Sequence, residues 1–262
     1  MSRIRDAFAG GKAFIPFVTC GDPDLETTKR IVTGMAEAGA DLIELGIPFS
    51  DPTAEGPVIQ EANLRALSGG VTTEDIFRMT AELKETVKIP LLYMTYANVV
   101  YSYGTVQFAK KAADAGIDGI ILPDVPYEEQ EEFSGAFRAE GIDLISMIAP
   151  TSLDRIRMIA SRAEGFLYVV SSLGVTGVRS EISTDLGAMT AEIRKANPGL
   201  PCAIGFGIST PEQAEKMAAL ADGVIVGSAI VRQIGQYGKE APAKAAAYVR
   251  EMKRAVSRAE QR

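Results

Sequence analysis

Two glutamates stand in the segment from Glu44 to Pro57, and both could transfer protons. Glu44 lies inside an apolar, strand-like run (DLIELG), and Glu55 lies on the loop that follows it. The chain contains no histidine, so proton transfer near neutral pH falls to groups such as these. We therefore expect Glu44 and Glu55 to be the catalytic residues.

Each carboxylate also has a structural alternative. Glu44 could form a buried ion pair, but no lysine or arginine stands in the neighbouring runs at 14–20 and 91–95. A carboxyl group in an apolar site has a raised pKa, which suits a group that both donates and accepts a proton. Glu55, between alanine and glycine, could instead be a solvated loop residue. Asp51 is expected to fix a turn through its side chain.

Glycine-rich segments follow three later strand-like runs: Gly174 to Gly177, Gly205 to Gly207, and Gly227 with Ser228. Glycine lets a backbone approach a ligand closely, and a helix N-terminus presents free N–H groups to anions. Each segment alone could be a plain turn. Together they predict a phosphate site.

The elements that must position these residues alternate between strand and helix. Eight strand-like runs occur at 14–20, 41–46, 91–95, 117–122, 142–149, 166–171, 201–205 and 222–227. Helical patterns lie between them at 25–38, 73–87, 105–115, 128–140, 153–163, 185–196 and 211–220, with a last one at about 239–259. Eight such units predict a single (β/α)8 TIM barrel over residues 1–262, with extra loop at 47–71 and 172–184.

Further candidates lie in or after other strands. Tyr93 and Tyr96 could line a pocket, while Asn98 and Asp124 could either fix loops or touch substrate, with loop fixing favoured. Tyr168 could place its hydroxyl beside Glu44, or be a core tyrosine with a satisfied hydroxyl.

Composition limits the partners. The chain has 262 residues, 47% of them hydrophobic, and a formal net charge of -7, which argues against a nucleic-acid or anionic-membrane surface. No apolar run approaches bilayer length. Two cysteines fit neither a metal site nor a disulfide framework. We expect a cytoplasmic protein that binds a small molecule.

The motifs also carry a family resemblance along essentially the whole chain. The chain resembles the alpha subunit of tryptophan synthase through the segments PFVTCGDP (16–23), ELGIPFSDP (44–52), GPVIQ (56–60), YAN (96–98), PDVP (123–126), GVTG (174–177) and GFGI (205–208). The resemblance implies a TIM barrel that cleaves indole-3-glycerol phosphate by a retro-aldol reaction to indole and glyceraldehyde 3-phosphate.

The resemblance also implies roles for matching residues. Glu44 would be the acid–base group that protonates indole C3 and assists removal of the glycerol hydroxyl proton. Phe17, Ile59 and Phe206 would surround the indole, and Thr176 would lie on a loop that closes over the site. Tyr96 and Tyr168 are added as substrate-binding candidates because of their positions beside the strands. Phosphate would bind Gly177, Gly207 and Ser228, and Gly227 joins them as part of the same glycine-rich segment as Ser228. The family usually has aspartate where this chain has Glu55, so the second carboxylate carries one extra methylene.

The family implies a beta subunit as partner, in an alpha2-beta2 tetramer, with pyridoxal phosphate on that subunit. No lysine stands in an obvious Schiff-base setting, so we expect no cofactor and no metal on this chain. Two alternatives remain: another phosphate-binding barrel enzyme, such as an isomerase or an indole-glycerol-phosphate synthase, and a weakly catalytic activator of the beta subunit. The synthase needs a general-acid lysine near a strand end, and none is evident here. Glu55 is the only feature that favours the activator.

Overall fold

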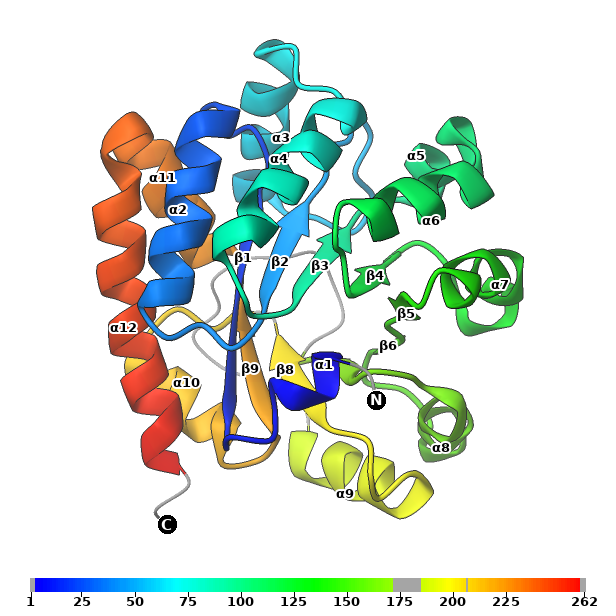
Figure 1. Cartoon of the computed structure of the whole chain (residues 1–262). Coiled ribbons are helices and arrows are strands. Elements are labelled where there is room, and N and C mark those ends of the chain that lie inside the picture. Colours follow the sequence, from blue (N-terminus) through cyan, green and yellow to red (C-terminus); the bar gives the residue numbers. More distant parts are fainter. Residues whose placement is uncertain (1–2, 172–184, 206, 260–262) are drawn as a thin grey trace.

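A computed structural model of the chain describes residues 3–171, 185–205 and 207–259. Its strands form one parallel sheet in the order β5-β4-β3-β2-β1-β9-β8-β7-β6, surrounded by helices (Figure 1). The strands are β1 (Ala13–Thr19), β2 (Ile43–Gly46), β3 (Leu91–Met94), β4 (Gly119–Ile121), β5 (Asp143–Leu144), β6 (Met147–Ile148), β7 (Leu167–Val170), β8 (Cys202–Gly205) and β9 (Gly223–Val226).

The two edge strands of this order, β5 and β6, are neighbours in the chain. β5 pairs with β4, and β6 pairs with β7, so the segment 143–148 bridges both ends of the sheet. Between them, the Ile145 N–H donates to the Ile120 carbonyl and the Tyr168 N–H donates to the Ser146 carbonyl. β5 and β6 are therefore two halves of the fifth barrel strand, and the TIM barrel expected from the sequence is confirmed.

The chain also forms helices, most of which cover the outside of the sheet (Figure 1). They are α1 (Arg3–Asp6), α2 (Leu25–Glu37), α3 (Pro57–Ser68), α4 (Thr73–Thr86), α5 (Ala97–Tyr103), α6 (Thr105–Asp114), α7 (Glu131–Ala139), α8 (Leu153–Arg162), α9 (Leu186–Ala196), α10 (Pro211–Ala218), α11 (Ser228–Tyr237) and α12 (Ala241–Arg258), with short 3-10 turns η1 (Tyr127–Glu129) and η2 (Gly238–Glu240). Side-chain caps begin several of them: Asp24 accepts the Thr27 N–H at α2, and Thr72 forms a capping box with Asp75 at α4.

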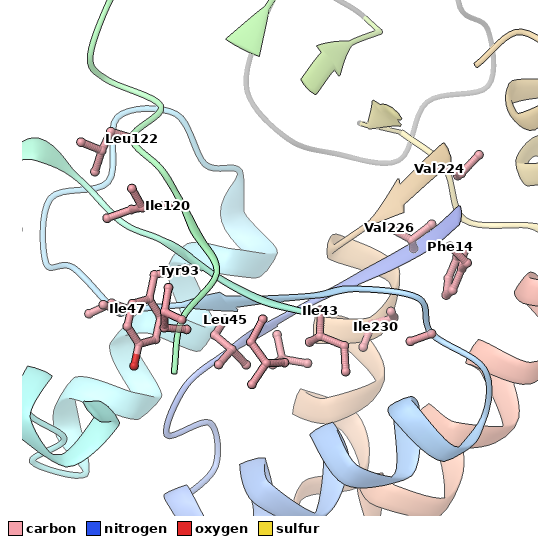
Figure 2. Packing of buried hydrophobic residues seen from close by; sticks show 14 of the residues in the cluster. Phe14, Ile43, Leu45, Ile47, Tyr93, Ile120, Leu122, Val224, Val226 and Ile230 are labelled. Carbon is pink, nitrogen blue, oxygen red and sulfur yellow. The ribbon is translucent and has the colours of Figure 1, made fainter. Parts of the chain in front are cut away.

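Alternate residues of each strand face opposite sides, which separates two apolar layers. The larger layer lies between strands and helices, and Figure 2 shows part of it, including Phe14, Ile43, Leu45 and Tyr93. The smaller layer fills the barrel interior with residues such as Leu42 and Tyr168, and the buried Ile4 of α1 joins it. Glu44 has the same strand parity as Leu42, so its side chain belongs to the interior.

The structure corrects two expectations about local structure. The connection 47–71, expected to be loop, contains the twelve-residue helix α3, which begins with Pro57 at its first position after Gly56. Tyr93 does not line a pocket: it is fully buried in the outer layer, and its hydroxyl donates to Thr80 Oγ1 of α4 at 2.7 Å. The expected loop at 172–184 lies outside the described residues.

Within the described ranges, no helix is both long and apolar enough to cross a membrane.

Candidate active site

Glu44 is buried at the centre of the candidate site. It pairs in register with Phe17 of β1 and Leu92 of β3, and the residue is only 1% exposed. Its Oε1 atom has no hydrogen-bond partner, and no ion pair reaches Glu44 from the described parts of the chain. Burial raises the pKa of Glu44 from 4.5 to about 8, so the carboxyl is mostly protonated at neutral pH.

Tyr168 of β7 lies close to Glu44 within the barrel. Burial and, to a smaller extent, the charge of Glu44 raise the pKa of Tyr168 well above its ordinary value. The tyrosine ring lies over Gly205 of β8, where an added Cβ would collide with the hydroxyl and with two ring carbons. Phe17 lies over Gly46 of β2 in the same way, 2.5 Å from the place of a Cβ. Glycine at the ends of these two strands makes room for the aromatic rings.

Glu55 is also buried, although it lies on a loop. It is 6% exposed, and its Oε2 accepts a hydrogen bond from Asn63 Nδ2 of α3 at 2.7 Å. Burial raises the pKa of Glu55 from 4.5 to about 7, although the Asn63 hydrogen bond lowers it. The solvated-loop alternative is therefore wrong for this residue. Sequence reasoning missed Asn63, although the Gly56-Pro57 pair signals the start of the helix that carries it.

An ion pair fixes α3 against the loop after β1. Arg65 of α3 donates from Nε and Nη2 to the two carboxylate oxygens of Asp22, each at 2.8 Å. Asp22 is 1% exposed, so removal of Arg65 would leave a buried charge without this partner. The pair holds the helix that carries Ile59 and Asn63.

Tyr96 and Asp124 connect neighbouring loops at the barrel mouth. The Tyr96 hydroxyl accepts the Ala54 N–H at 3.1 Å, and its ring packs on Phe49 at 5.3 Å between centroids. Burial, followed by the Glu55 charge, raises the pKa of Tyr96. Asp124 accepts the Ala97 N–H with both oxygens, at 3.0 and 3.2 Å. Asp124 therefore fixes a loop, as favoured from the sequence.

An apolar cluster and a cavity lie beside these groups. Phe17 and Ile59 belong to one buried cluster, and Met94 of β3 packs against it. Met94 also lines a cavity of about 620 Å³ at the barrel mouth, whose other walls include Ala54, Leu122, Met147, Ile148 and Val170. This volume lies within the usual range for small-molecule sites.

The N-terminus of α11 offers a place for an anion. Gly227 caps the helix without a side-chain hydrogen bond, and Ser228 is its first residue. The first N–H groups of such a helix have no partner inside the helix. Gly207 has φ of +76°, a conformation that favours glycine. The predicted site residues Thr176, Gly177 and Phe206 lie outside the described residues.

Comparison with known proteins decides the family. The sequence pattern of the tryptophan synthase alpha chain family matches residues 5–259. The chain belongs to this family. A tryptophan synthase alpha chain of Lactiplantibacillus plantarum is 49% identical over 257 residues, which cover 98% of this chain and 97% of that protein. One from Lacticaseibacillus casei is 46% identical over 98% of this chain and 96% of its own length.

Solved structures agree with this assignment. A crystal structure of the tryptophan synthase alpha chain from Legionella pneumophila has a TM-score of 0.86 and 35% sequence identity, and covers 98% of each chain. A tryptophan synthase complex from Pyrococcus furiosus has a TM-score of 0.82 and 35% identity, covering 92% of this chain and 98% of that one. The resemblance, the fold and the assignment to a carbon–carbon lyase of tryptophan biosynthesis are confirmed.

Proposed function

We propose that the barrel mouth binds indole-3-glycerol phosphate and that Glu44 is the acid–base group for its cleavage. The observation that carries this proposal is a carboxyl group, 1% exposed, whose Oε1 has no hydrogen-bond partner in the described structure. Because burial raises the pKa of Glu44 to about 8, the group holds a proton that it can deliver at neutral pH.

In this mechanism Glu44 donates one proton and takes up another, so it ends in its starting form. Glu44 donates its proton to indole C3, and the ring nitrogen then carries the positive charge. The bond between C3 and the glycerol carbon breaks, and its electron pair restores the aromatic indole. The hydroxyl on that glycerol carbon becomes an aldehyde and gives its proton to the Glu44 carboxylate. The products are indole and glyceraldehyde 3-phosphate, and Glu44 is again protonated.

Glu55 is proposed to accept the indole N–H and to stabilise the positive charge on the ring. This role needs the carboxylate form, which is accessible because the pKa of Glu55 is about 7. The pKa of Glu44 is thus higher than that of Glu55, which suits a proton donor at Glu44 and a carboxylate at Glu55. The hydrogen bond from Asn63 to the end of the longer side chain supports a placed carboxylate in spite of the extra methylene.

The remaining predicted residues are proposed to bind the substrate at its two ends. Phe17, Ile59, Tyr96 and Tyr168 would contact the indole, and the common packing of Phe17 and Ile59 supports this role. Thr176 and Phe206 stay predictions from the sequence. Gly207, Gly227 and Ser228 would bind the phosphate, which the uncapped start of α11 supports. Gly177 stays a prediction.

The chain is proposed to act as one barrel domain together with a tryptophan synthase beta subunit, in an alpha2-beta2 tetramer. Structures of tryptophan synthase complexes among the similar chains support the partnership. Pyridoxal phosphate would belong to the beta subunit, with no cofactor on this chain. A cytoplasmic location is proposed because Cys20 and Cys202 are free, buried thiols.

Replacement of Glu44 tests the function. The Glu44→Gln variant, assayed in complex with the beta subunit, should form no measurable indole from indole-3-glycerol phosphate while it still binds glyceraldehyde 3-phosphate. Retained turnover would refute the role of Glu44. If the unmodified complex also formed no indole, yet the chain still stimulated the beta reaction, the activator alternative would replace the lyase.

A further inference from the structure

The carboxylate of Glu55 is held by a residue to which the mechanism above gives no role. Asn63 is 4% exposed and donates from Nδ2 to Glu55 Oε2 at 2.7 Å. A buried amide beside a buried carboxyl is costly unless the two are paired, so this contact determines where the carboxyl rests. Within the described ranges, Asn63 is the side chain that bonds to this carboxylate.

The main chain on both sides of Glu55 is fixed by other contacts. The Gln60 side-chain amide donates to the Glu55 carbonyl at 2.7 Å, and the Ala54 N–H donates to the Tyr96 hydroxyl at 3.1 Å. These bonds hold the backbone but do not reach the carboxylate. The hydrogen bond that fixes the end of the side chain comes from Asn63.

The distance between the main chain at residue 55 and the Asn63 amide fits the length of a glutamate side chain. Asn63 comes six residues after Pro57, so it lies about 9 Å farther along the helix axis at 1.5 Å per residue. The side chains of Glu55 and Asn63 must therefore extend toward one another along α3 to meet. An aspartate on the same backbone would end about 1.5 Å short, the length of one carbon–carbon bond. A hydrogen bond of 2.7 Å does not survive such a gap.

We propose that Asn63 is the positioning residue for Glu55, holding Oε2 against α3 so that Oε1 is left to accept the indole N–H. This inference rests on the proposed function of Glu55. A donor to the carboxylate also favours its ionised form, which is the form that accepts the N–H. Asn63 thus acts on both the direction and the protonation of Glu55 without touching the substrate.

The test compares Asn63→Leu and Asn63→Asp with the unmodified chain, each in complex with the beta subunit. Leucine has a similar volume but no donor, and aspartate keeps the shape but replaces the donor with a second carboxyl group. For both variants we expect kcat for indole formation to fall about 10- to 100-fold, because displacement of a catalytic group by about 1 Å has effects of this size. The acid limb of the kcat/KM profile should move to higher pH, farther for aspartate than for leucine.

Gln60→Leu is the matched control, because it removes an amide from the same helix that bonds to the Glu55 main chain only. Its acid limb should stay where it is in the unmodified chain. An unchanged kcat and acid limb in a folded Asn63→Leu or Asn63→Asp protein would overturn the inference. Glu55→Gln distinguishes a failure of the proposed role of Glu55 from a failure of the positioning role of Asn63. Full activity of Glu55→Gln would refute the role of Glu55. An inactive Glu55→Gln together with fully active Asn63 variants would refute only the positioning role of Asn63.

Discussion

Replacement of Glu44 by glutamine should make stability less sensitive to alkaline pH. The pKa of Glu44 is about 8 in the folded chain against an ordinary value of 4.5, because burial disfavours the charged form. Between these values the unfolded chain loses the proton while the folded chain keeps it. Stability therefore falls as pH rises from 4.5 to 8, and below pH 4.5 this penalty is absent. Glutamine cannot ionise and carries no such penalty.

The size of the effect follows from the width of that window. A span of about 3.5 pH units, at 1.36 kcal/mol per unit, is worth on the order of 5 kcal/mol at pH 8. At pH 6 the same arithmetic gives about 2 kcal/mol. The new side-chain N–H2 group adds a cost of about 1–3 kcal/mol if it finds no acceptor, but that cost does not change with pH. The decisive quantity is therefore the slope of the difference between the two proteins.

Chemical unfolding between pH 4 and 8.5, followed by near-ultraviolet circular dichroism, measures this slope. The free energy of unfolding of Glu44→Gln minus that of the unmodified chain should rise by about 1.4 kcal/mol per pH unit between pH 5 and 8, and flatten below pH 4.5. Glu132→Gln, the same chemical change at an exposed position of α7, is the matched control. Parallel curves for Glu44→Gln and the unmodified chain would refute the assignment of a buried, protonated carboxyl.

Three further outcomes are expected. The pH profile of kcat/KM for indole formation should be bell-shaped. It should rise through about pH 7 as Glu55 ionises and fall through about pH 8 as Glu44 loses its proton. A profile that is flat from pH 6 to 9 would contradict both assignments. Glu55→Asp should lower kcat about 10- to 100-fold because the shorter side chain loses the hydrogen bond from Asn63. Equal or higher activity would show that the loop readjusts. Gly205→Ala should displace the Tyr168 ring, raise KM and lower the free energy of unfolding by about 1–3 kcal/mol. Adding Tyr168→Leu to the same protein should partly restore the stability. An unchanged KM would mean that the ring does not contact substrate.

Much of the fold could be predicted because strand and helix patterns alternate clearly along the chain. Seven of the eight strand-like runs correspond to one observed strand each, and the run 142–149 corresponds to the split pair β5 and β6. The split could not be predicted, since it depends on how β4 and β7 approach the segment from both sides. The helix α3 has a weak apolar period because its buried face includes the small Ala62 and Ala66 and the polar Asn63, although Gly56-Pro57 signals its start.

The site was predictable where burial alone decides the chemistry. Glu44 stands among apolar strand residues, so its raised pKa follows from the sequence pattern. The environment of Glu55 was not predictable, because its burial depends on Asn63, which meets it only once α3 is folded. Tyr93 was misassigned because its strand parity, opposite to that of Leu92, directs it to α4 rather than to the barrel interior.

The split strand formed by β5 and β6 contributes a weakly paired segment to the wall of the mouth cavity. Met147 and Ile148 belong to β6, only two residues long, and both line the cavity. The opposite side of the barrel has the seven-residue strand β1, which pairs with β9 over residues 13–16 and with β2 over residues 17–19. Few ladder hydrogen bonds resist a small shift of 147–148, whereas many resist a shift of β1. The barrel thus combines a continuously paired side, which carries Phe17 beside Glu44, with a weakly paired side in the wall of the mouth cavity.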